Sequence, residues 1–284
     1  MLARRIRNSL AVIGALLPFA AFAEGQPRKT VAVGNTEGRQ NMSIEQHAQG
    51  TAAATVRTSD ATARVAPALE RYSERVLGEL WRRPGLSPRD RGIVTIAVVI
   101  ARNQTIEMPG QFRRALDNGL KPSELSEIIT HLAFYSGWAN AMSAVTAADA
   151  VFVERKIGTD QLPAADATLL PLDQTAEAQR ATSVEQTAGP VSPALVQYTG
   201  EVLFRDLWLR PGLAPRDRSL VTVSALVASG QVAQVPFHLN RAMDNGLTKA
   251  ETSEVLAHLA FYAGWPNVFS AVPVVREVFE KRPR

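Results

Sequence analysis

The chain contains the same unit twice. Residues 81–145 align with residues 208–272 without a gap, at a constant shift of 127 positions, and 34 of the 65 aligned residues are identical. Identity at this level marks a duplication, and two copies predict a pseudo-symmetric pair, whereas a solenoid needs at least about three repeats to bury its core. We therefore expect two similar bodies that pack against each other.

The start and stop signals inside each copy are those of helices. The run Ser-Pro-Arg-Asp at 87–90 supplies a capping hydroxyl, a proline for the first turn and an acid, and an apolar run over 93–101 follows. The β-branched residues of this run would also suit a buried strand, but its length and the start signal favour a helix. Thr-Lys-Ala-Glu at 248–251 forms a capping box, and Asp-Asn-Gly at 117–119 and 244–246 ends a helix. We therefore expect an all-α fold of two pseudo-symmetric bundles with about five helices each.

The N-terminus has the layout of a secretory signal peptide. Arg4, Arg5 and Arg7 precede an apolar stretch over 10–22, and Ala-Phe-Ala ends the segment at residue 23. The stretch is shorter than the roughly 20 residues that a transmembrane helix requires, which disfavours the alternative of an N-terminal membrane anchor. We predict cleavage after residue 23, export to the periplasm or the medium by the general or the twin-arginine route, and no membrane association afterwards.

These signals divide the chain into five parts. The parts are a signal peptide over 1–23, a flexible tail over 24–62, a first repeat over 63–157, a linker over 158–192 and a second repeat over 193–284. Removal of the signal peptide takes away three arginines and no acid, so the formal net charge falls from +4 to +1. A charge this small does not favour binding to nucleic acid.

Several kinds of chemistry are excluded by residues that the sequence lacks. It contains no cysteine, which excludes disulfides, thiolate nucleophiles, CxxC redox chemistry and cysteine-ligated zinc or iron–sulfur sites. A G-x-S-x-G elbow, an H-E-x-x-H pair and a glycine-rich phosphate loop are also missing. A mechanism without a cofactor or a metal is therefore the simplest expectation.

Each copy carries a glutamate, a histidine and a tyrosine at intervals of four residues. They are Glu127, His131 and Tyr135 in the first copy, and Glu254, His258 and Tyr262 in the second. This spacing places the three side chains on one face of a helix, so the carboxylate can orient the imidazole. Two interpretations remain open: a buried hydrogen-bond network that fixes helix packing, and the lining of a substrate cavity.

His238 is an imidazole that the duplication does not repeat, because Gln111 occupies the matching position in the first copy. A proline two residues earlier predicts that His238 lies near a helix N-terminus, where the helix dipole favours a neutral imidazole that can act as a base. Glu107 of the first copy matches Gln234, so acid and imidazole would complete one site if the copies face each other. The alternatives are a surface histidine without a function and, if His238 and His258 meet near a glutamate, a metal site.

The central helix of each copy begins with Arg-Asp-Arg. Guanidinium groups at a helix N-terminus bind carboxylates, so Arg216 and Arg218 are candidates for holding a substrate carboxylate. Alternatively, these arginines form ion pairs that fix the preceding Arg-Pro-Gly-Leu loop. The aromatic residues around the turn after the third helix are expected in the core, with pocket walls as a second interpretation; they are Phe134, Trp138, Phe261 and Trp265.

Taken together, these motifs resemble the carboxymuconolactone decarboxylase family. Each copy contains Arg-Pro-Gly-Leu-x-Pro-Arg-Asp-Arg, then Asp-Asn-Gly-Leu, then Ser-Glu-x-x-x-His-Leu-Ala-Phe-Tyr-x-Gly-Trp, and the resemblance covers about 69–152 and 195–279. It implies an all-α bundle that assembles into rings of trimers or hexamers. A two-copy chain would then be a built-in dimer, and a trimer of chains would form a ring like a hexamer.

The resemblance also implies two possible chemistries. The peroxidase branch of the superfamily uses a CxxC pair with a nearby histidine, and Gln104 and Glu107 stand at the matching positions of the first copy, so a thiol peroxidase is disfavoured. The decarboxylase branch acts on a γ-lactone carboxylate without a cofactor, and its Glu-x-x-x-His pattern places the histidine at His238. Gln111 in the first copy and the predicted export depart from that pattern.

We therefore hypothesise a cofactor-free lyase or isomerase that acts on a small carboxylate or lactone, with His238 as the general acid/base. In this hypothesis a histidine–glutamate pair positions substrate or relays a proton, and an arginine of the Arg-Asp-Arg turn holds the carboxylate. The competing hypothesis is a non-catalytic binding or assembly protein on the same fold. The catalytic candidates are His238, His258, Glu254 and Glu107, and the substrate-binding candidates are Arg216, Arg218, His131, Tyr262 and Trp265.

Overall fold

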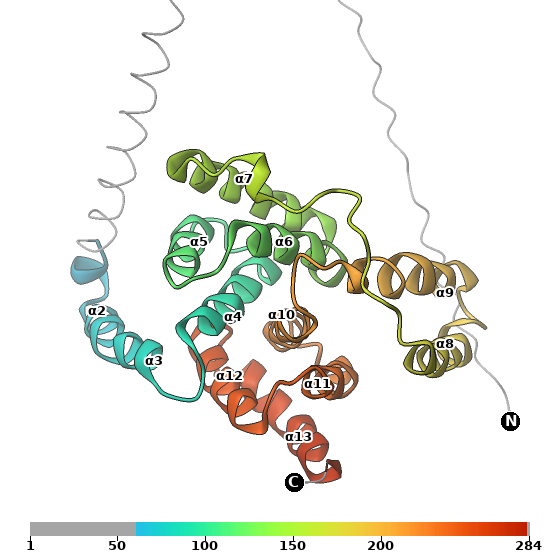
Figure 1. Ribbon diagram of the computed structural model, residues 1–284. Helices are drawn as coiled ribbons and strands as arrows, with labels where there is room; N and C mark the ends of the chain where they lie inside the picture. The colour runs from blue at the N-terminus through green and yellow to red at the C-terminus, as the bar shows by residue number, and fades with distance from the viewer. Residues whose placement is uncertain (1–60, 283–284) are drawn as a thin grey trace, which may run out of the picture. The chain divides into compact units, whose positions relative to one another are not determined.

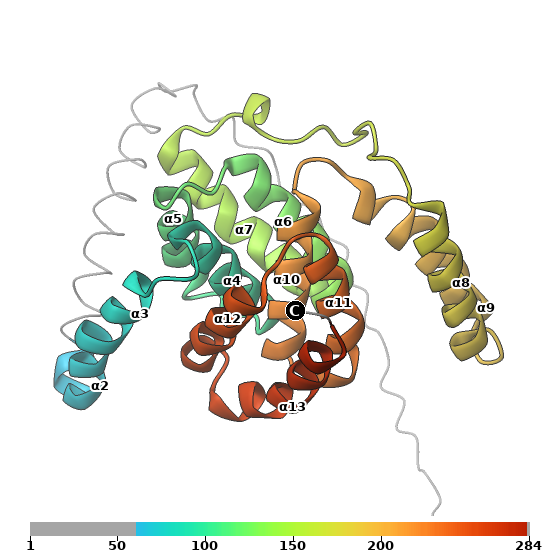
Figure 2. The ribbon, with the colours of Figure 1, turned by 60° about the horizontal axis from the view of Figure 1, so that its bottom comes forward.

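Two helices, α4 (Pro88–Ala101) and α10 (Pro215–Ala228), lie side by side at the centre of the fold (Figure 1, Figure 2). The computed structural model describes residues 61–282, which belong to one of the chain's two units, Thr51–Arg284. The predicted signal peptide and nearly all of the predicted tail lie outside the described residues. Residues 90–100 of α4 and 217–228 of α10 are all buried, because helices of both copies surround each of them.

The four longest helices follow the same order in both copies, and shorter segments precede or separate them. The first consists of α2 (Pro67–Tyr72), η1 (Ser73–Leu77), α3 (Gly78–Arg82), α4, α5 (Met108–Asp117), α6 (Pro122–Ser136) and α7 (Trp138–Arg155). The second consists of α9 (Pro193–Tyr198), η3 (Thr199–Phe204), η4 (Leu207–Leu209), α10, η5 (Val232–Gln234), α11 (Val235–Asp244), α12 (Lys249–Tyr262) and α13 (Trp265–Lys281). Of the shorter segments, η1 and η3 are π-helices, and η4 and η5 are 3₁₀ helices. Residues 61–282 contain no strand, which confirms the all-α expectation. None of the helices in this part of the chain is long and apolar enough to cross a bilayer.

The predicted helix starts are present in the structure. The Ser87 hydroxyl accepts a hydrogen bond from the backbone N–H of Asp90 at 3.0 Å, and α4 begins at the next residue after Ser87. At the start of α12, Thr248 and Glu251 form the expected capping box. The apolar run over 93–101 is helical, so the strand alternative is wrong.

The segment between the copies, predicted as a linker, contains a helix. Helix α8 (Gln174–Ala188) follows η2 (Thr159–Gln161) and packs against α9 (Figure 1, Figure 2). Asp173 caps it, because its carboxylate accepts hydrogen bonds from the N–H groups of Thr175 and Ala176, both at 3.0 Å. Alanine, glutamate and glutamine in this segment have high helix propensity, whereas its weak apolar periodicity concealed the helix.

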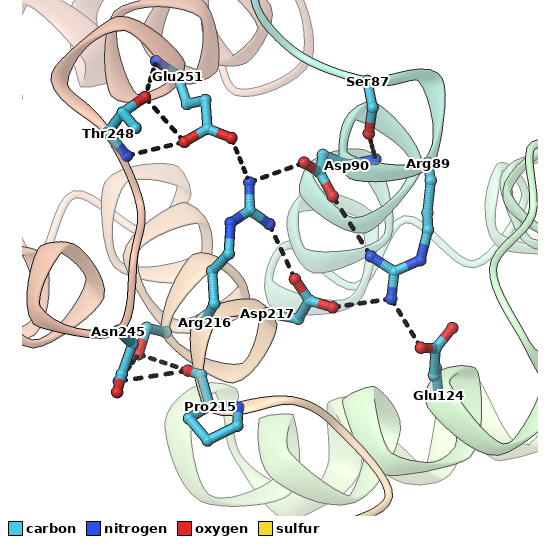
Figure 3. Close-up of polar contacts among 11 residues, drawn as sticks. Ser87, Arg89, Asp90, Glu124, Pro215, Arg216, Asp217, Asn245, Thr248 and Glu251 are labelled. Carbon is cyan, nitrogen blue, oxygen red and sulfur yellow. Dashed lines mark hydrogen bonds and ion pairs between the residues drawn. The ribbon is translucent and has the colours of Figure 1, made fainter.

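The copies exchange helices across the centre. Helix α6 of the first copy packs on α10, and α12 of the second packs on α4. Where α4 and α10 begin, six charged residues form what we call the central charge cluster (Figure 3). Its ion pairs are Arg89 with Asp217 (2.7 Å), Glu124 (2.7 Å) and Asp90 (3.4 Å), and Arg216 with Asp90 (2.9 Å), Glu251 (2.7 Å) and Asp217 (2.9 Å). Each arginine therefore joins both copies.

The aromatic residues at the junctions of α6 with α7 and of α12 with α13 are not in the core. Trp138 is 64% exposed and Trp265 is 50% exposed, and each contacts a phenylalanine edge to face, Phe134 at 5.6 Å and Phe261 at 4.9 Å between ring centroids. The core interpretation of these four residues is wrong. They lie where α6 and α12 give way to α7 and α13, on the outward faces of these helices, whereas the core is built around α4 and α10.

We predict that the central charge cluster is worth far more than a surface ion pair. In an Asp217→Ala variant, Arg89 and Arg216 lose a buried partner, and we expect the free energy of unfolding to fall by about 3–5 kcal/mol. The control is Asp117→Ala, which removes an ion pair with Arg155 whose acid is 61% exposed and should cost less than about 1 kcal/mol. Urea denaturation measures both, and similar losses in the two variants would contradict the prediction.

Candidate functional site

The face between the copies holds two equivalent polar clusters, each built from both copies. The first cluster joins Glu127, His131 and Tyr135 of α6 to Trp208, Arg218 and Thr222 of the second copy. The second cluster joins Glu254, His258 and Tyr262 of α12 to Trp81, Arg91 and Thr95 of the first copy. The helical spacing of four in α6 and α12 presents each glutamate, histidine and tyrosine to the other copy's central helix.

In the first cluster the polar side chains of the α6 stripe, our name for the glutamate, histidine and tyrosine spaced four residues apart, are paired. The same three residue types of α12 form the α12 stripe. Arg218 Nη2 donates to the Glu127 carboxylate at 2.9 Å, and His131 Nε2 is 2.7 Å from the Thr222 hydroxyl. Trp208 Nε1 donates to the Tyr135 phenol at 2.8 Å. Burial, with the Arg218 charge adding to it, holds the pKa of His131 well below its ordinary value, so this imidazole is neutral.

The second cluster repeats this geometry. Arg91 Nη2 donates to Glu254 at 3.0 Å, His258 Nε2 is 2.8 Å from the Thr95 hydroxyl, and Trp81 Nε1 donates to Tyr262 at 2.8 Å. Burial, reinforced by Arg91, lowers the pKa of His258 to about 3. The geometry therefore favours the interpretation of both stripes as buried hydrogen-bond networks that join the copies.

The Arg-Pro-Gly-Leu loops close over these clusters. Arg218 Nη2 also donates to the backbone carbonyl of Arg210 at 2.9 Å, and Arg210 Nη2 donates to Glu127 at 2.7 Å. A Cβ atom at Gly212 would lie 2.7 Å from Cγ of Glu127, so only glycine lets the loop approach the carboxylate this closely. The motif is thus explained by the ion pair that it covers.

His238 makes the two clusters unequal. It lies on α11 beside the first cluster, with its ring centroid 5.2 Å from that of Tyr135 and 5.9 Å from that of Trp208. A cavity of about 450 Å³ opens next to it, with walls from His238 and Phe237 of α11, Tyr135 of α6, and residues of α8, α9 and η3. This volume suits a small molecule.

His238, which lines the cavity, and Arg241 beside it each have a buried nitrogen atom without a partner in residues 61–282. For His238 this atom is Nδ1 of the imidazole. Burial, with the nearby Arg241 charge adding to it, lowers the pKa of His238 to about 4, so the imidazole is neutral at neutral pH. Arg241 lies over the Trp208 ring at 4.3 Å and forms no ion pair within residues 61–282. Burial raises the pKa of Tyr135, which therefore keeps its phenolic proton.

The predicted catalytic residues are divided between the two clusters. His238 faces Tyr135 and the first cluster, whereas His258 and Glu254 belong to the second. The expected hollow shared by His238 and His258 is therefore not formed, because helix exchange places each α6 or α12 stripe beside the other copy's α5 or α11. Glu107 is exposed and lies beside Gln111, 3.5 Å from its side-chain amide, away from the His238 cavity.

The predicted substrate-binding residues are also spread out. Arg216 is held in the central charge cluster, and Arg218 is completely buried against Glu127, so neither guanidinium reaches the cavity. Tyr262 belongs to the second cluster and Trp265 lies at the surface. His131 stacks on Tyr135 at 4.8 Å and contacts the cavity only through that ring. In residues 61–282 no three side chains of histidine, aspartate or glutamate lie close enough to hold a metal ion.

Three residues of the cavity region were not singled out from the sequence. Tyr135 was recognised only as a member of its stripe, since nothing in one copy shows which stripe faces His238. Arg241 stands three residues after His238, on the same face of α11, and this spacing was an available signal. Arg180 of α8 lines the cavity, and no pattern in the predicted linker pointed to it.

Comparison with known proteins agrees with the duplicated architecture. The model of the carboxymuconolactone decarboxylase family matches residues 66–150 and 193–277, more than half of the chain. A 4-carboxymuconolactone decarboxylase of Acinetobacter baylyi is 40% identical over 75 residues, which are 26% of this chain and 56% of that protein. A nitrosuccinic acid decarboxylase of Metarhizium robertsii is 30% identical over 86 residues, 30% of this chain and 60% of that protein. The chain thus spans somewhat more than half the length of these curated relatives.

The charge of Arg241 should be visible in the titration of His238. We expect Arg241→Met to raise the pKa of His238 from about 4 towards, but not to, its ordinary value, because burial continues to oppose the imidazolium. NMR titration of the imidazole nitrogens measures it. The matched control is Arg114→Met, which removes the guanidinium over Trp81 in the second cluster and should raise the pKa of His258 while leaving that of His238 unchanged. A pKa of His238 that is the same with and without Arg241 would contradict the assignment.

Proposed function

Because the chain belongs to the carboxymuconolactone decarboxylase family, we propose that it is a decarboxylase, a carbon–carbon lyase that acts on a small carboxylate or lactone, with His238 as general acid/base. The observation that carries the proposal is that His238, whose Nδ1 atom has no partner in residues 61–282, lines a cavity of about 450 Å³. The names of both relatives describe removal of carbon dioxide from a small organic acid. The similarity covers only part of each relative, so the activity and the substrate of this chain are proposals.

The reaction breaks the bond between the carboxylate carbon and its neighbour. Carbon dioxide leaves, the electron pair stays on the neighbouring carbon and spreads into a conjugated acceptor of the substrate, and a proton then forms the new C–H bond. Because the substrate holds the electron pair itself, the proposed reaction requires no cofactor. The protein has to stabilise an anion and deliver one proton.

Tyr135 and His238 are suited to these two tasks. The Tyr135 phenol accepts a hydrogen bond from Trp208, which leaves its own proton free to be donated to the developing anion. His238 is neutral in the free protein, and a bound anion beside it raises its pKa, so that it takes up the proton that it later delivers to carbon. His131, stacked on Tyr135, positions the phenol.

We propose one working site in each chain. The second cluster has Gln111 in the place of His238, and an amide cannot exchange a proton at neutral pH. In this proposal His258 and Glu254 hold the copies together and do not take part in the reaction. Export of the protein remains a prediction of the first 23 residues.

The proposed role of His238 has a direct test. We expect His238→Gln to lower the rate of carbon dioxide release by about 10²- to 10⁴-fold, since proton transfer by a placed side chain is worth this much. The purified mature protein is first screened against lactones and β-keto, nitro and hydroxy acids. Gln111→Ala, at the matching position of the first copy, is the control and should keep the wild-type rate. An unchanged rate in His238→Gln rejects the assignment, and a wild type inactive on every acid favours the non-catalytic binding protein.

We also propose that chains assemble through the outward faces of α7 and α13. Exposed apolar residues recur there at a helical spacing of four and three, in equivalent places of the two copies; they are Trp138, Met142 and Val145, and Trp265, Phe269 and Val272. Two equivalent apolar stripes in each chain suit a closed ring, and exposed patches of this kind mark interfaces.

Light scattering after size exclusion tests the assembly. The wild type should elute at about three times the mass of one chain, and the double variant Trp138→Glu, Trp265→Glu should elute as a single chain because two buried charges would oppose the contact. Val191→Glu replaces an apolar residue that is 85% exposed outside both stripes, and it should leave the mass unchanged. A wild type that elutes as one chain would contradict the proposal.

A further inference from the structure

The segment between the copies forms a wall of the His238 cavity. Helix α8 lies outside both matches to the family model, which end at residue 150 and resume at 193. It contributes Arg180 and Ser183, among other residues, to the cavity that His238 and Tyr135 line from the opposite copies. The cavity of this chain therefore includes a part that the family pattern does not supply.

Arg180 is built into that wall. It is only 7% exposed, and its Nε and Nη2 atoms donate to the two carboxylate oxygens of Glu177 at 2.7 and 2.9 Å. Its guanidinium carbon lies 4.5 Å from the centroid of the Phe204 ring. Nη1 is buried and has no partner. One edge of the guanidinium is thus fixed by Glu177, while the remaining nitrogen keeps donors that nothing in the described chain accepts.

The charges near Arg180 are not balanced. Glu177 also accepts a hydrogen bond from Arg205 at 3.1 Å, so two guanidinium groups share this carboxylate. Arg241, 5.5 Å from the centroid of the same Phe204 ring, forms no ion pair within residues 61–282, and the only carboxylate charges that act on it are the more distant ones of Glu177 and Asp173. A partly buried excess of positive charge is costly unless an anion joins it. The cavity therefore has the electrostatic character of an anion site.

We propose that Arg180 binds a carboxylate that the substrate keeps through the reaction, so that the site selects small acids with a second anionic group. The inference that Arg180 binds an anion does not depend on the proposed function. It rests on the proposed function only in calling that anion a substrate. The retained carboxylate is the appropriate partner, because a strong ion pair with the departing carboxylate would stabilise the ground state and oppose loss of carbon dioxide. Glu177 is a positioning residue, since it holds the guanidinium in place.

A structural interpretation of Arg180 makes a different prediction. Arg180 and Glu177 are three residues apart on α8, and such a pair could serve only to stabilise the helix. In that case the loss of Arg180 would change the stability of the protein but not its affinity for anions. Binding of a probe without a reactive group separates the two interpretations and does not depend on turnover.

The test is calorimetric titration of the full mature chain with succinate, a small dicarboxylate, and with succinamide, its neutral analogue. We expect the wild type to bind succinate and not succinamide, and Arg180→Gln to weaken succinate binding about 10- to 100-fold, the worth of one charge-assisted hydrogen bond. The control is Arg205→Gln, which removes the other guanidinium on Glu177; Arg205 is 55% exposed in its side chain and does not line the cavity. Thermal unfolding confirms that both variants are folded.

The outcomes separate this inference from the proposed function. It is overturned if the wild type does not bind succinate, if Arg180→Gln binds it within about twofold of the wild type, or if Arg205→Gln weakens binding as much. Binding through Arg180 by a protein that releases carbon dioxide from no acid supports the anion site and rejects the decarboxylase. With an active substrate, Arg180→Gln should raise KM for a dianionic acid more than for a monoanionic one.

Discussion

Arg91 and Arg218 are buried completely, and neither has a carboxylate partner in its own copy. A guanidinium group cannot be removed from water without a counter-charge, and here the counter-charge is Glu254 or Glu127 on a helix of the other copy. Neither copy can therefore fold into this shape alone. The exchange of α6 and α12 across the centre, and the glycine loops that close over each carboxylate, follow from this requirement.

Duplication within one chain allows the two clusters to differ. A symmetric pair of identical subunits would carry the same residue in both places, whereas this chain has His238 beside the first cluster and Gln111 beside the second. The same hydrogen-bond network is present in both clusters, so the helices pack in the same way at each of them. In the proposed function the first cluster gains an imidazole that can exchange a proton, while the second joins the copies without one.

The surroundings of His238 determine what the imidazole can do. Aromatic rings on several sides remove water, and Arg241 adds positive charge, so the ring is held neutral until an anion arrives. In the reaction that we propose, a bound anionic substrate would therefore raise the pKa of His238. Helix α8 forms one wall of the cavity beside His238, and it comes from the segment between the two matches to the family model.

The sequence by itself determined the duplication, the helical class, the caps at Ser87 and Thr248 and the family, because these depend on local spacing and on motifs that each copy repeats. It also distinguished His238, since an aligned position that differs between copies is visible without coordinates. Only the tertiary structure decided which stripe faces His238, that Trp138 and Trp265 lie outside the core, and that Arg180 reaches the cavity. The physical reason is that these features depend on contacts between residues far apart in the chain. Such contacts determine which helices the copies exchange, which faces of α7 and α13 point outward and where α8 packs, and local periodicity does not predict them.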